Sequence, residues 1–130
     1  MDNERSAIIT IDGTEYPLTL TTYATKKIVE RYGGIESLGD KIMNSDHAEL
    51  ALAEIVWIIV LLANQRIMAD NLRRVNPPRE LLTEEAVELL TQPVELLSFR
   101  DAIMEAFIKG TKRDVESEAA GDESKNAPVG

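Results

Sequence analysis

The sequence Ile55-Val56-Trp57-Ile58-Ile59-Val60-Leu61-Leu62-Ala63 is the most apolar stretch of the chain, and it decides the fold. It lies inside a helical pattern over residues 47–75, which predicts one helix or two helices divided near Asn64. A helix that is apolar on every side is either the central helix of a core or a membrane span. The uninterrupted run holds nine residues, whereas a span needs about 20, so the pattern favours a core helix.

Two β-strand patterns precede this helix. Residues 6–11 and 14–20 are rich in β-branched and apolar residues, and Asp12-Gly13 between them is a strong signal for a two-residue hairpin turn. The second strand has an alternating apolar face that begins with Tyr16, and Pro17 marks it as an edge strand. A lone hairpin is marginally stable in water, so we expect it to pack on the helices or to pair with another chain.

Capping residues and apolar stripes predict the other helices. Four segments follow this pattern: 23–32, capped by Thr21-Thr22 and ended by Gly33-Gly34; 35–43; 84–91, capped by Thr83; and 94–109, begun by Pro93 and closed by Gly110. Asn76-Pro77-Pro78 is expected to stop the long helix at residue 75. The predicted fold class is α+β and mostly α-helical, with an N-terminal β-hairpin packed with about five helices.

The C-terminal region has a different composition. Residues 114–130 carry five acidic residues and one lysine, with almost no large apolar side chain. Such a segment buries too little surface to fold, so a disordered acidic tail is predicted. The domain organisation expected from the sequence is a single α-rich domain over residues 1–113, followed by this tail.

The composition excludes several classes of function. The chain has no cysteine, so disulfides, thiolate zinc sites, iron–sulfur clusters and cysteine nucleophiles are absent. Its single histidine excludes a multi-histidine metal site. The net charge of −9 disfavours nucleic acid and anionic membrane surfaces as partners. The first five residues are polar, unlike a signal peptide, so a cytosolic protein is expected.

No group of side chains has the pattern of a catalytic site. His47 lies near Asp46 and Glu49, but no nucleophile motif accompanies it, and we interpret it as a surface histidine. The other charged groups are interpreted as solvated helix faces: Asp101 with Glu105, Glu84 with Glu85 and Glu88, and Lys26 with Lys27 and Arg31. We therefore expect no enzyme activity, no metal and no cofactor.

The apolar helix also predicts an interaction surface. A small protein has few elements with which to cover all sides of one helix, so another subunit or a client is expected to cover part of it. Tryptophan is the residue most enriched at interface hot spots. The candidate interaction residues are Trp57, Ile58, Leu61 and Leu62 on this helix, and Tyr16 on the edge strand.

The order of the segments has a further meaning. In sequence order they are Ile11-Asp12-Gly13-Thr14-Glu15-Tyr16-Pro17-Leu18, Ile28-Val29-Glu30-Arg31-Tyr32-Gly33-Gly34, the long apolar helix, Asn76-Pro77-Pro78, Leu82-Thr83-Glu84-Glu85, and Ser124-Lys125-Asn126-Ala127 in the acidic tail. This series resembles the tail assembly chaperone family of long-tailed, siphovirus-type bacteriophages and prophages. The resemblance covers nearly the whole chain and rests on order and pattern.

The resemblance implies a non-enzymatic function. Chaperones of this family coat the hydrophobic tape measure protein before the tail tube polymerises around it, keep it soluble, and are absent from the mature virion. Many exist in two lengths through a ribosomal frameshift, and the longer form contacts the tail tube protein. This chain would be the short form, a homo-oligomer in the host bacterial cytoplasm with the tape measure protein as its partner.

Two other functions remain open on the sequence. A phage tail structural or head–tail joining subunit fits the same context, although such proteins are usually richer in β-structure. A small acidic regulator that masks a basic partner fits the charge. An enzyme would need a site built from carboxylates alone, and no pair of carboxylates is forced together by the sequence.

Overall fold

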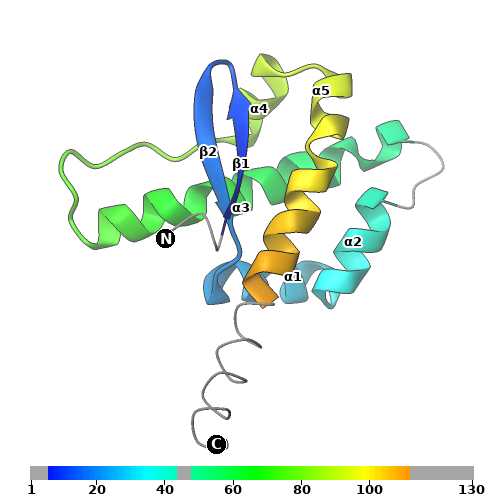
Figure 1. The fold of residues 1–130 in the computed structure, drawn as a ribbon, viewed down its shortest axis with the longest axis horizontal. Helices are drawn as coiled ribbons and strands as arrows, with labels where there is room; N and C mark the ends of the chain where they lie inside the picture. Colours follow the sequence, from blue (N-terminus) through cyan, green and yellow to red (C-terminus); the bar gives the residue numbers. More distant parts are fainter. Residues whose placement is uncertain (1–5, 44–47, 112–130) are drawn as a thin grey trace, which may run out of the picture.

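A computed structural model describes residues 6–43 and 48–111 of the chain. In these ranges the fold is α+β and mostly helical, with a two-stranded antiparallel hairpin packed with the helices, as predicted (Figure 1). The elements in order are β1 (Ser6–Ile11), β2 (Thr14–Thr19), α1 (Thr22–Tyr32), α2 (Ile35–Met43), the 3-10 helix η2 (Ala48–Ala51), α3 (Leu52–Leu72), α4 (Glu84–Leu90) and α5 (Pro93–Ser98). After α5 the chain continues as a helix over residues 100–111, named here helix 100–111.

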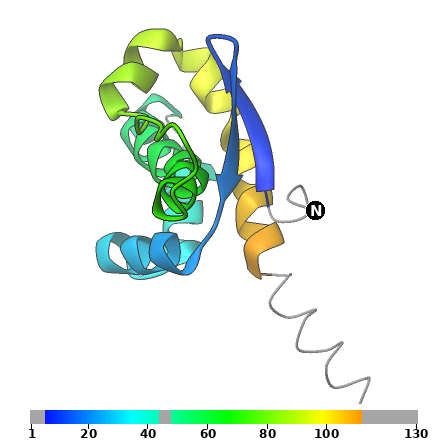
Figure 2. The same ribbon diagram turned by 90° about the vertical axis from the view of Figure 1, so that its left-hand side faces the viewer.

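The hairpin forms where the sequence predicts it. Asp12 and Gly13 both adopt positive φ, 50° and 82°, which is the conformation of a type I′ turn. β1 pairs antiparallel with β2, and Ile8 lies opposite Pro17. The hairpin packs across α3 and buries Leu18 completely (Figure 2). The hairpin is therefore held by the helices, as its marginal intrinsic stability requires.

The long helix α3 crosses the centre of the molecule and forms the core. Ile55, Ile59 and Leu62 are fully buried, and α3 contacts β2, α1, α2, α4 and α5. Within the described ranges, Glu49–Leu72 is the one segment long and apolar enough to cross a membrane, and 56% of its most apolar window is buried inside the molecule. Burial of this kind is the property of a core helix.

The long helix is continuous through Asn64, in agreement with the prediction of one helix and against the alternative of a break. The Asn64 side chain is buried and hydrogen-bonded rather than competing with the helix backbone. The predicted end of the helix is wrong. The helix ends at Leu72, three residues earlier, because the chain turns at Arg74, which has φ 65°. Leu72 and Val75, at the end of the predicted helix, are exposed.

The predicted caps of α1 and α4 are confirmed. Thr21 and Thr83 each accept a hydrogen bond on the side-chain oxygen from the backbone N–H three residues later. Gly33 ends α1 in the left-handed conformation with φ 89°. These local signals fix the angles at which the helices enter and leave the core.

The prediction of one helix over residues 94–109 is wrong in two respects. The helix is divided at Phe99, whose backbone N–H bonds to Leu96 O, and the second part runs to residue 111. Gly110 does not close it. A Cβ atom at Gly110 would lie 2.8 Å from Cβ of Leu20, so this glycine allows the helix to approach the end of the hairpin. The predicted acidic tail over 114–130 and His47 lie outside the described residues.

Candidate functional site

The five candidate interaction residues do not form one exposed surface. Ile58 and Leu62 are fully buried in the core, so neither side chain lies on the surface of the folded chain. Trp57, Leu61 and Tyr16 are half-buried and pack against the core. A helix side that looks free in the sequence is covered here by the hairpin and the neighbouring helices.

The exposed side of Trp57 is occupied by side chains of α1. The Arg31 guanidinium lies 4.7 Å from the centre of the Trp57 ring, and Tyr32 packs edge-to-face on it at 5.6 Å. The Tyr32 hydroxyl is buried without a hydrogen-bond partner in the described part of the chain. Its burial raises the pKa of Tyr32 above 10.0, and the neighbouring Arg31 opposes this shift. Trp57 thus takes part in an intramolecular cluster.

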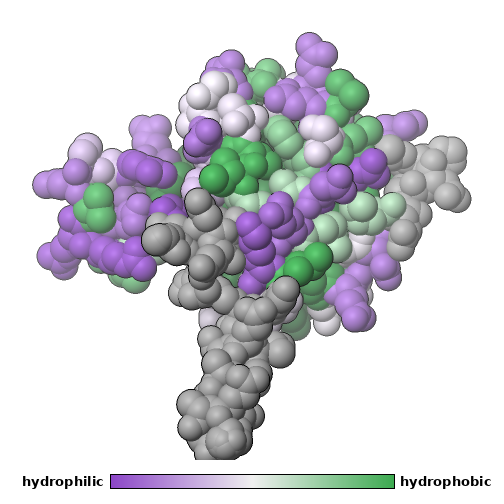
Figure 3. All heavy atoms as spheres, viewed as in Figure 1, coloured by the Kyte–Doolittle hydropathy of each residue, from purple (hydrophilic) through white to green (hydrophobic). Residues whose placement is uncertain are grey.

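A groove between α2 and helix 100–111 is the best candidate site. Its volume is about 590 Å³. Its lining residues come from one stripe on each helix: Ile35, Glu36, Gly39, Asp40 and Met43 on α2, and Met104, Phe107, Ile108 and Thr111 on the other helix. The three- and four-residue spacing along each stripe places these side chains on facing helix surfaces. Figure 3 shows hydrophobic residues gathered where the two helices meet.

Two contacts join the walls of the groove. Met104 lies beside Gly39, where a Cβ atom would be in ordinary van der Waals contact with Met104 Cε at 3.4 Å. At one end Arg100 donates to Ile42 O of α2 at 3.4 Å and to Leu97 O of α5 at 3.1 Å. The groove is thus an open surface between two helices that are in contact with each other.

The groove combines an apolar interior with an acidic edge. Phe107 is almost fully buried at its floor, whereas Met43 and Ile108 remain exposed at its sides. Glu36 and Asp40 lie along the α2 side. Methionine side chains adapt to different apolar surfaces, which suits a site that accepts more than one sequence.

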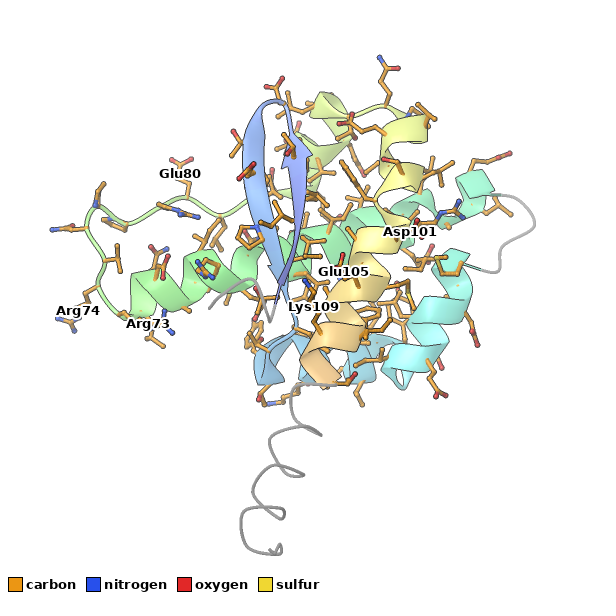
Figure 4. All side chains as sticks on the ribbon, in the orientation of Figure 1. Arg73, Arg74, Glu80, Asp101, Glu105 and Lys109 are labelled. Carbon is orange, nitrogen blue, oxygen red and sulfur yellow. The ribbon has the colours of Figure 1, made fainter. Side chains whose placement is uncertain are left out.

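The hydroxyl group that lines the groove is satisfied within its own helix. Thr111 donates to Phe107 O at 2.9 Å, which leaves its methyl group for contacts with a ligand. On the outer side of the same helix, Glu105 pairs with Lys109 at 3.0 Å, and Asp101 lies one turn before Glu105 (Figure 4). No cluster of three or more potential metal ligands occurs among the described side chains. The groove therefore offers shape and charge for binding.

The sequence gives little sign of the groove. Ile35 and Phe107 fit the apolar stripes that predict the two helices, and the remaining lining residues read as an ordinary mixed surface. The one local signal is Gly39, a residue with poor helix propensity inside a predicted helix. The pairing of α2 with helix 100–111 brings together residues as far apart as Ile42 and Arg100, 58 positions along the chain, which no local pattern predicts.

The chain was also compared with known proteins. No family model, curated protein or solved structure matches it.

Proposed function

We propose that the chain is a non-enzymatic tail assembly chaperone of a siphovirus-type phage or prophage, which binds the tape measure protein and keeps it soluble in the host cytoplasm. The observation that carries the proposal is the apolar, acid-edged groove between α2 and helix 100–111. A groove lined by two helices is the usual receptor for the apolar face of a third helix. A helical segment of the tape measure protein is the occupant we assign to it.

The charge of the groove favours a particular kind of segment. Glu36 and Asp40 attract a helix whose apolar face is bordered by lysine or arginine, because opposite charges raise the rate and specificity of association. Exposed Met43 and Ile108 would then be covered by the client. The net charge of −9 gives the resulting complex the mutual repulsion that opposes aggregation. Several copies along one extended client, and a longer form that contacts the tail tube protein, belong to the same proposal.

The direct test is co-expression with the tape measure protein of the same phage, followed by a pull-down and light scattering. We expect the tape measure protein to stay soluble in a complex that contains several copies of the chain. If the tape measure protein precipitates and the chain is recovered free, the proposal fails.

A pair of matched variants tests the groove itself. Ile108→Glu places a charge on an exposed groove residue, and Val29→Glu places the same charge on an exposed position of α1 outside the groove. Ile108→Glu is expected to weaken binding of a tape measure peptide at least about tenfold, because the buried carboxylate loses its hydration. Val29→Glu is expected to bind as the natural chain does. Equal binding by both variants would place the client elsewhere.

Two alternatives predict different results. A tail structural or joining subunit would be recovered from purified virions, whereas the chaperone is expected to be absent from them. A small acidic regulator would be recovered with a basic enzyme that acts on nucleic acid, and its binding would not depend on Ile108.

A further inference from the structure

The chain projects an exposed arm at the end of α3. Residues 72–81, named here the arm, leave the end of α3 and return alongside it (Figure 1). All ten residues are exposed, and they include Leu72, which is 84% exposed, and Val75. The arm supplies nothing to the core, although its composition is partly apolar.

Two asparagines attach the returning segment to α3. Asn71 donates to Arg79 O and accepts from Arg79 N, both at 3.0 Å. Asn64 makes the same pair of bonds with Leu82, at 2.9 and 2.8 Å. We call these two pairs of hydrogen bonds the asparagine clamps. Asn64 and Asn71 are seven residues apart on the helix, a rise of about 10.5 Å, and their partners Leu82 and Arg79 are three extended residues apart, a span of about 10 Å. The spacing of the two asparagines therefore matches the spacing of their partners. The arm is therefore a built element with a fixed base.

The turn into the arm places arginine where glycine is the usual residue. Val75 N bonds to Asp70 O and Arg74 N to Asn71 O, which is the Schellman pattern of a helix C-terminus. Arg74 occupies its left-handed position with φ 65°, a conformation that costs energy for a residue with a Cβ atom. An arginine held in this conformation points to a function for its side chain.

The arm carries three arginines and one acidic residue, Glu80, so it has a net positive charge as well as apolar side chains. Arg73 pairs with Asp70 at 3.4 Å, whereas the guanidinium groups of Arg74 and Arg79 have no ion pair with any residue in the described ranges. Figure 4 shows Arg73 and Arg74 at the outer end of the arm, pointing away from the body of the molecule. A partner surface complementary to the arm would therefore be acidic and apolar.

The same chain carries such a surface at the corner between α4 and α5. Leu89 and Val94 are about three-quarters exposed, Leu90 is also exposed, and only two residues separate the helices. Glu85 and Glu88 are exposed on α4 beside these leucines. A group of exposed apolar side chains bordered by charged residues is a candidate contact surface. We name these five residues the acidic corner.

We propose that the arm of one copy docks on the acidic corner of a second copy. Contact between two arms would place arginines against arginines, and contact between two acidic corners would place glutamates against glutamates. Contact between an arm and a corner pairs opposite charges and covers apolar groups on both sides. The arm and the corner lie apart on one molecule (Figure 1), so the contact joins different copies head to tail. Such contacts extend into rings or filaments. RNA is the less suitable occupant, because it would leave Leu72 and Val75 uncovered and the chain carries a charge of −9.

The test is light scattering of the purified full chain over a range of protein and salt concentrations. We expect a mass above 14.4 kDa that rises with protein concentration and falls with added salt. The arm variant Arg74→Glu/Arg79→Glu and the corner variant Glu85→Arg/Glu88→Arg should each associate at least about tenfold more weakly. Mixing the two variants should restore association, because each reversed surface then meets its complement.

Three results would overturn the proposal. They are a monomeric mass for the natural chain at millimolar concentration, an oligomer that neither variant weakens, and two weakened variants that fail to associate when mixed. Retention of a monomeric natural chain on single-stranded RNA, lost in the arm variant, would assign the arm to nucleic acid instead. Circular dichroism and urea unfolding check that each variant folds. In the absence of a client, Ile108→Glu should have the same mass by light scattering as the natural chain. A failure of the proposed client groove can therefore be distinguished from a failure of the proposed arm contact.

Discussion

The middle of α3 and its C-terminal end both carry apolar residues, and these residues have opposite environments. In the middle, residues 55–63 are enclosed by the hairpin and the other helices, and Leu62 is fully buried. At the other end, Leu72 is 84% exposed and the chain beside it is held by asparagine side chains. The difference shows that one helix is stabilised in two ways. Apolar burial holds the helix from Ile55 to Ile67, and directed hydrogen bonds organise the surface at its C-terminal end.

This division has a functional meaning. Apolar burial is nondirectional and fixes the core without exposing anything to a partner. Amide clamps such as that of Asn71 bind only backbone atoms, so they position a segment while its side chains stay free for external contacts. The core of this chain is thereby separate from the arm, whose side chains are left for the contact that we propose.

The largest effect expected is that of shortening leucine in the two regions. Leu62→Ala should lower the free energy of unfolding by about 3–4 kcal/mol, because it removes buried methyl groups and leaves a cavity. Leu72→Ala should change it by less than about 0.5 kcal/mol. Urea unfolding followed by the fluorescence of Trp57, the single tryptophan, measures both. Similar losses in the two variants would contradict the assignment of Leu72 to the surface.

Loss of the buried asparagine clamp should lower the free energy of unfolding more than loss of the exposed one. Asn64→Ala leaves the Leu82 N–H and C=O without partners in a buried site, and should cost about 2–3 kcal/mol. Asn71→Ala frees the exposed Arg79 backbone to bind water, and should cost about 0.5–1 kcal/mol. Limited proteolysis should cut the arm faster in Asn71→Ala. Unchanged cleavage in that variant would mean that the clamp does not hold the arm.

Tyr32 provides the contrasting case of a buried polar group with no partner in the described chain. Tyr32→Phe should raise the free energy of unfolding by about 1 kcal/mol, because it removes an unsatisfied hydroxyl. Burial raises the pKa of Tyr32 above 10.0, so the unfolded chain loses this proton first. The stability of the natural chain should therefore fall as the pH rises through the raised pKa, and Tyr32→Phe should lack this component. Unfolding in urea at pH 8 and above pH 10 compares the two.

The smallest effect expected is at the turn into the arm. Arg74→Gly should raise the free energy of unfolding by about 0.5–1 kcal/mol, because glycine adopts positive φ without steric cost. The same variant should weaken the association of copies that we propose for the arm. A variant that gains stability and keeps full association would separate the backbone strain from the function assigned to Arg74.

Much of the fold follows from signals that act within a few residues. Asp12-Gly13 specifies the turn, and Thr21 and Thr83 cap their helices as predicted. Gly33 ends α1 where expected. Each of these signals depends on backbone preferences or on a hydrogen bond to a neighbour in sequence, so it survives without knowledge of the rest of the chain.

Only the tertiary structure decided which neighbours bury each apolar side chain and which groups bond each polar one. Asn64 looks like a helix break and is a clamp, because Leu82 lies beside it. Ile58 looks available to a partner and is core, because the hairpin and the other helices enclose α3. The groove at Gly39 and the close approach at Gly110 also depend on segments far away in sequence. Burial is a property of the packed neighbours of a residue, and only folding brings those neighbours together.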